Sequence, residues 1–204
     1  MSKPFKLALT LSLLTIAANL VEGTISTIMG AQDEALALFG FGIDSFIEVL
    51  SALGVTLMIL RMQKNPDSSR SNAEVTALKI TGVSFYILVI GLIFSGALSL
   101  FLQRKPETTL PGIIISVLSL SVMFFLYRAK LSTGKKMQNQ AIIADAYCTK
   151  TCIYMSVVLL VSSLTFTLTG FAFLDVIGAL GIAWFAFSEG REAFEKASNL
   201  AQAD

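Results

Sequence analysis

The sequence contains no histidine, only two cysteines and four prolines, and few charged residues, which make up 14% of the chain. Without histidine, and without a nucleophile and a base at a recognisable spacing, an intramembrane or soluble enzyme is disfavoured, so we expect a protein that is not an enzyme. Two cysteines inside an apolar stretch are not the framework of a disulfide-stapled secreted domain. A net charge of +1 without a basic stripe excludes a nucleic-acid partner.

Apolar residues, in contrast, are abundant. They make up 54% of the chain and give a mean hydropathy of +0.74, which is more apolar surface than a soluble core of 204 residues can hide. Charges cluster in short patches between long apolar runs, as expected for loops between membrane spans. There is no linker or low-complexity tract, and the tail after residue 195 is too short to fold alone, so we expect residues 1–204 to form a single transmembrane domain.

A transmembrane helix needs about 20 apolar residues, and segments of this kind can be counted along the chain. We predict six spans, at residues 5–29, 35–62, 75–102, 110–128, 139–164 and 173–194. Lys and Arg residues gather before the first span, after the second, after the fourth (Lys130 among them) and after the sixth. Because these residues favour the cytoplasmic side, the sequence predicts an all-α polytopic protein with both termini cytoplasmic, in the cell (plasma or inner) membrane.

Ionisable side chains within membrane spans are costly and usually face the bundle interior, so each one is a candidate functional residue. Asp44 and Glu48 are four residues apart on the second span and therefore project from one helical face. Cys148 and Cys152 repeat this spacing on the fifth span, and thiolates bind borderline and soft metals strongly. The other candidates within the spans are Glu22, Asp145, Lys150 and Asp175.

The two pairs together predict a metal site near the middle of the membrane. The second span runs inward and the fifth outward, so we expect inverted repeats, at whose interface transporters place their binding sites. Two carboxylates and two thiolates complete a tetrahedral shell that Zn²⁺ accepts, and Cd²⁺ fits the same ligands. Taken singly, each residue has a simpler reading as a hydrogen-bonded acid or a small apolar filler. The side-chain directions disfavour a disulfide between the two cysteines.

The segment 35–48, ALALFGFGIDSFIE, resembles the corresponding helix of the cation diffusion facilitator family, and the segment 144–152, ADAYCTKTC, resembles its partner helix. In this family these helices present the transport-site ligands, usually Asp, or His, four residues before Asp. The resemblance covers most of the chain and implies that the two predicted pairs are the ligands of a transport site. It is closest to the short form of the family, which lacks the cytoplasmic carboxyl-terminal domain.

The resemblance also implies an activity, the export of a divalent cation by proton antiport through alternating access. Zinc is the expected cargo, with cadmium or another transition metal as alternatives, and metal binding expels protons from thiols and carboxylates. Glu22, Asn19 and Asp145 are candidates for a proton relay or for support of the ligands. A rival function is a membrane protein that senses or buffers metal, or modulates a partner protein, with the same ligands and without transport.

Three further expectations concern residues outside the ligand set. Lys150 is expected to form a structural salt bridge with an intramembrane acid. Asp175 is expected either to cap the sixth helix or to contact ions. Any homodimer would form within the lipid bilayer, through the small residues Gly91, Ser95 and Ser99 on the third span, for which ordinary packing within one subunit is the alternative.

Overall fold

The computed structural model describes residues 3–64, 72–102, 110–137, 140–171 and 173–201. These residues form six helices: α1 (Lys3–Gln32), α2 (Leu36–Lys64), α3 (Asn72–Leu102), α4 (Leu110–Lys136), α5 (Gln140–Thr169) and α6 (Phe173–Ala201). Each helix is long and apolar enough to cross a membrane. The prediction of an all-α integral membrane protein with six spans is therefore confirmed, with one helix for each predicted span.

The helices extend beyond several of the predicted span ends. α4 continues to Lys136 instead of ending at residue 128, α5 continues to Thr169 instead of 164, and α6 continues to Ala201 instead of 194. Hydropathy marks where the apolar run ends, but a helix can continue beyond it. In α4, Lys135 and Lys136 lie in the last turn, where positive charge interacts favourably with the helix dipole. The predicted start of the fifth span, residue 139, lies outside the described residues.

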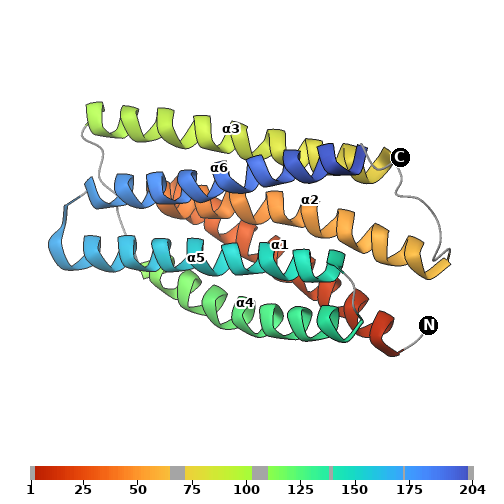
Figure 1. Ribbon diagram of the computed structural model, residues 1–204. Helices are drawn as coiled ribbons and strands as arrows, with labels where there is room; N and C mark the ends of the chain where they lie inside the picture. The colour runs from red at the N-terminus through yellow and green to blue at the C-terminus, as the bar shows by residue number, and fades with distance from the viewer. Residues whose placement is uncertain (1–2, 65–71, 103–109, 138–139, 172, 202–204) are drawn as a thin grey trace.

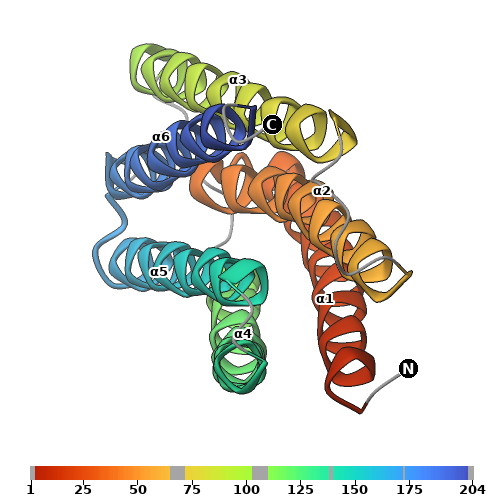
Figure 2. The same ribbon diagram turned by 45° about the vertical axis from the view of Figure 1, so that its right-hand side comes forward.

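The six helices pack as two similar halves of three. α1 packs against α2 as α4 packs against α5, and α2 packs against α3 as α5 packs against α6. Corresponding helices of the two halves also meet, α1 with α4, α2 with α5 and α3 with α6. Figure 2 shows the α3 and α6 pair on one side of the bundle and α1, α2, α4 and α5 on the other. This arrangement agrees with the expected repeat and brings the predicted ligand helices α2 and α5 together.

The start of α1 and the end of α6 lie at the same end of the bundle (Figure 1). An even number of spans requires this, and the positive residues near both ends agree with a cytoplasmic location. The cytoplasmic orientation of both termini stays a prediction.

Two glycines allow α1 and α2 to approach closely. A Cβ atom added at Gly30 would collide with the backbone of Phe39, and one added at Gly42 would collide with the backbone of Thr27. Close backbone approach through small residues is a usual way for membrane helices to associate, since the hydrophobic effect provides no attraction between helices in lipid. The α1 and α2 pair is therefore held by backbone proximity that larger residues would prevent.

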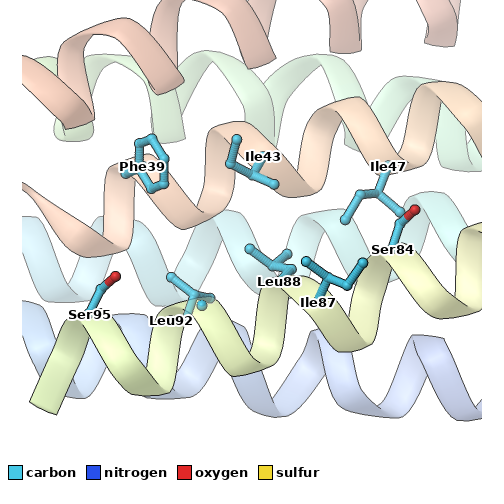
Figure 3. A pocket seen from close by; sticks show the side chains of 9 residues that line it. Phe39, Ile43, Ile47, Ser84, Ile87, Leu88, Leu92 and Ser95 are labelled. Atoms are coloured by element: carbon cyan, nitrogen blue, oxygen red, sulfur yellow. The ribbon is translucent and has the colours of Figure 1, made fainter.

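α3 packs mainly against α6 and less extensively against α2. Between α2 and α3 is an apolar groove of about 340 Å³, shown in Figure 3. It is lined by Phe39, Ile43, Ile47, Ser84, Ile87, Leu88, Gly91, Leu92 and Ser95. A Cβ atom added at Gly91 would have no atom within 4 Å, so this small residue does not serve close packing inside the subunit.

We predict opposite effects of alanine at these two kinds of glycine. In a helix interior, Gly→Ala usually stabilises by about 0.5–1 kcal/mol. Gly91→Ala should show this gain or no change, whereas Gly42→Ala should lower the melting temperature, because its methyl group meets the backbone of α1. Thermal unfolding of the detergent-solubilised protein measures both, and a Gly42→Ala protein as stable as wild type would contradict the close packing of α1 and α2.

Candidate metal centre

Glu48 and Cys152 meet where α1, α2 and α5 converge. The Cys152 thiol donates a hydrogen bond to Oε1 of Glu48. On the other side of this carboxyl group, Nδ2 of Asn19 donates to Oε2 at 3.0 Å. One predicted ligand of α2 and one of α5 are therefore in direct contact, with the side chain of Asn19 orienting the carboxyl group.

A small cavity adjoins this contact. Its volume is about 20 Å³, which is enough for one water molecule or one ion. It is lined by Thr15, Asn19, Glu48, Ala52, Asp145, Cys148, Thr149 and Cys152. Three of the four predicted ligands and two of the three predicted supporting residues therefore surround one space in the middle of the bundle.

Asp44, the fourth predicted ligand, is buried on α2 one turn before Glu48. Its Oδ1 atom has no hydrogen-bond partner among the described residues, and neither has Oδ1 of Asn19. The carboxyl groups of Glu22, Glu48 and Glu189 are close enough to Asp44 to interact with it electrostatically. Buried polar atoms are normally paired, so unpaired oxygens among several acids are a surrounding in which a cation would be stabilised.

The four predicted ligands do not surround a single point in this conformation. Within the described residues, no three Cys, Asp or Glu side chains are grouped so that they could hold one metal ion. Both cysteines are free thiols, in agreement with the expectation that they do not form a disulfide. The assignment of Asp44, Glu48, Cys148 and Cys152 as one metal site stays a prediction, and it requires side chains to turn toward the cavity when the ion arrives.

Glu22 belongs to a second set of hydrogen bonds. Oγ of Ser45 donates to Oε1 of Glu22 at 3.0 Å, and Ser119 also bonds to this carboxyl group. The hydroxyl groups of Ser119 and Ser156 are 2.9 Å apart, and Ser156 donates to the backbone carbonyl of Cys152 at 2.8 Å. Polar side chains thus connect Glu22 on α1 with the backbone of α5 at Cys152, and the role of Glu22 as a proton relay stays a prediction.

Asp145 forms a buried ion pair with Lys130, with Nζ 2.8 Å from Oδ2. The expectation that Lys150 forms the salt bridge is wrong, because Lys150 lies with its Nζ 5.4 Å from the ring centre of Tyr154. Lys130 was expected in a cytoplasmic loop, because the fourth span was predicted to end at residue 128. Removing one partner of a buried pair typically costs about 3–5 kcal/mol, because the other charge is then left without a partner in the interior.

Glu189 on α6 is a candidate that the sequence analysis did not single out. The hydroxyl of Thr151 on α5 donates to its Oε1 at 2.8 Å. Glu189 lies in the predicted sixth span, and its spacing from the buried residues Ile182, Ala186 and Ala193 continues one helical face. This periodicity could have identified it as a partly buried acid in contact with α5.

Asp175 caps a helix, but not the one expected. Its Oδ2 accepts a hydrogen bond from the backbone N–H of Leu36 at 2.8 Å, and Oδ1 accepts one from Ala37 at 3.2 Å. These are the first amide groups of α2, which have no partner within their own helix. The expectation of a cap on the sixth helix is therefore corrected. Asp175 joins the start of α6 to the start of α2.

This cap can be tested by substitution. Asp175→Ala should lower the free energy of unfolding by about 1–2 kcal/mol, because two amide groups lose their acceptor and α2 loses a negative charge at its positive end. Asp175→Asn, which keeps one side-chain oxygen, should lose less. Thermal unfolding in detergent measures the difference, and an Asp175→Ala protein with unchanged stability would show that the two hydrogen bonds do not hold α2.

Comparison with known proteins yields a family and several distant relatives. The chain is 26% identical to the manganese efflux system protein MneS of Bacillus subtilis over 150 residues, which is 72% of this chain and 52% of that protein. It is 27% identical to the manganese efflux system protein MneP of the same organism, over 67% of this chain and 47% of that protein. An uncharacterized transporter of Methanocaldococcus jannaschii is 27% identical over 86% of this chain and 64% of its own length.

The chain thus spans about half to two thirds of the length of these relatives. The family model for the cation efflux transmembrane domain matches residues 12–200, which include α2 to α5 in full, most of α1 and α6, and the cavity between α2 and α5. On this match the chain belongs to the cation efflux family, the cation diffusion facilitators that its second and fifth spans resemble.

Proposed function

We propose that this integral protein of the cell membrane transports divalent metal cations, with α2 and α5 carrying the ligands. The observation that carries the proposal is the contact between the Glu48 carboxyl group and the Cys152 thiol, beside a cavity that Cys148 also lines. Carboxyl and thiol groups lose their protons when they bind a metal, so a cation replaces the hydrogen bond between them. Membership of the cation efflux family supports the same activity.

The proposed cargo is Zn²⁺, with Cd²⁺ as the second candidate. Thiolate ligands favour Zn²⁺ and other soft or borderline ions, whereas Mn²⁺ prefers oxygen. Two relatives are named as manganese efflux proteins, so Mn²⁺ is the competing cargo. The two thiols at Cys148 and Cys152 are the feature of this chain that argues for zinc.

We further propose that metal export is coupled to proton import by alternating access. Metal arrival must displace protons from the ligands, and returning protons displace the metal. Glu22, which is connected through Ser119 and Ser156 to α5, is the proposed relay, and Asn19 supports Glu48. Asp145 is engaged by Lys130, so its proposed role is to support the ligands on α5.

Flux measurements on single-ligand variants test this function. In proteoliposomes containing a metal-sensitive dye, a proton gradient should drive Zn²⁺ or Cd²⁺ flux by the wild-type protein. Glu48→Gln and Cys152→Ser should each reduce this flux by about 100-fold or more, because loss of even an indirect metal contact typically costs 10–100-fold. Wild-type flux of Mn²⁺ above that of Zn²⁺ would overturn the proposed cargo.

Glu195→Gln is the matched control, because this exposed carboxyl group pairs with Arg191 and does not line the cavity. Its flux should equal that of the wild type. Metal binding by the wild type without any flux would favour the rival function of a metal sensor or buffer. Full flux in both ligand variants would remove the site assignment while leaving transport in place.

A homodimer within the membrane is the last part of the proposal. Gly91 is exposed and open, Ser95 lines the groove between α2 and α3, and Ser99 is partly exposed on the same helix. Small residues that do not pack within the subunit leave space for the close approach of a second helix. The proposed partner surface is therefore α3 with this groove.

Blocking that surface should dissociate the dimer. Gly91→Ile places a branched side chain where a partner helix would approach, and we expect it to shift the detergent-solubilised protein toward monomer in light scattering. Ala97→Ile is the control, since Ala97 is exposed on a different face of α3. Equal masses for both variants and the wild type would exclude this face as the dimer interface.

A further inference from the structure

Lys130 is a buried cation beside the candidate metal centre. Only 1% of its side chain is exposed. Its Nζ donates to Oδ2 of Asp145 at 2.8 Å and to Oγ1 of Thr149 at 3.0 Å. The Thr149 hydroxyl donates its own proton to the backbone carbonyl of Asp145 at 3.1 Å, which leaves its lone pairs for the lysine. The ammonium group is therefore held in one place by two partners on α5.

Asp145 lies on the wall of the cavity that Glu48, Cys148 and Cys152 also line. On α5 it precedes Cys148 by three residues and Cys152 by seven, so the three side chains share one helical face. Asp145 is thus placed as a third oxygen or sulfur donor from the same helix. In this structure the negative charge of Asp145 is neutralised by Lys130 and not by a metal ion.

The hardness of a metal site depends on how many oxygens it contains. A site made of Asp44, Glu48 and two thiols suits Zn²⁺ or Cd²⁺, and a site to which Asp145 adds a further carboxylate is better suited to Mn²⁺. A buried carboxylate that loses its cation must gain another cation or a proton, because an isolated charge is very costly in an apolar interior. Removing the lysine would therefore offer Asp145 to the metal.

We propose that Lys130 withholds the Asp145 carboxylate from the transported ion and thereby makes the site selective for soft over hard divalent cations. This inference rests on the proposed function, since it assumes that the ion binds between α2 and α5. Lys130 acts through Asp145, so it is a positioning residue and touches no metal itself.

The test is metal binding by purified full-length protein, measured by titration with MnCl₂ and with CdCl₂ and by the rise in melting temperature that each produces. In Lys130→Met, the affinity for Mn²⁺ relative to Cd²⁺ should rise about tenfold or more, because changing a residue that contacts a metal ligand typically alters metal affinity by about 10–100-fold. Mn²⁺ should also raise the melting temperature of this variant more than that of the wild type.

Two variants separate this role from a purely structural one. The double variant Lys130→Met with Asp145→Asn has neither charge, and its Mn²⁺ to Cd²⁺ ratio should return to that of the wild type. Lys150→Met, at the surface lysine beside Tyr154, should leave the ratio unchanged. If Lys130→Met does not unfold cooperatively, Lys130→Gln, which keeps a hydrogen-bond donor but not the charge, should change the ratio in the same direction.

An unchanged ratio in a folded Lys130→Met or Lys130→Gln protein overturns the inference. A changed ratio that persists in the double variant also overturns it, because the effect would not then pass through Asp145. Loss of flux in proteoliposomes with the binding ratios as expected would count against the proposed transport alone. Failure of the wild-type protein to bind either ion would overturn both proposals.

Discussion

Water does not solvate charged side chains in the hydrocarbon core, so these side chains are stabilised by partners within the bundle. In this protein the partners come from neighbouring helices, and the resulting contacts join the helices to one another. Lys130 neutralises the charge of Asp145, and this ion pair joins α4 to α5. Asp175 satisfies two amide groups of α2 from the start of α6. The Glu48 carboxyl group accepts two hydrogen bonds, one from Asn19 on α1 and one from the Cys152 thiol on α5.

The sequence was sufficient for those features that depend on local composition. Long apolar runs identified the six helices that the structure describes, and the spacing of four residues placed each predicted ligand pair on one face of its helix, α2 or α5. That Glu48 and Cys152 would meet followed only from the expected repeat of the two halves. Family membership was also accessible, because the residues that carry the resemblance lie on these two helices.

The features that the sequence did not reveal depend on pairing across helices. From hydropathy alone, Lys130 is predicted to lie in a loop. Its spacing nevertheless continues the buried face of α4, which includes Ser119, Met123 and Leu126. Lys150 is partly exposed, and its Nζ lies beside the ring of Tyr154. The partner of Asp175 is far away in the chain, and no local pattern connects an acid at the start of α6 with the start of α2.

The hydrogen bonds of Asp175 also constrain how the two halves can move. They join α6 to α2 at the end of the bundle opposite the two termini, as Figure 1 shows. These two hydrogen bonds oppose separation of α2 from α6 at this end. If the two halves move apart while the bonds persist, the bonded end acts as a hinge, and α2 and α6 separate most near the ends of the chain.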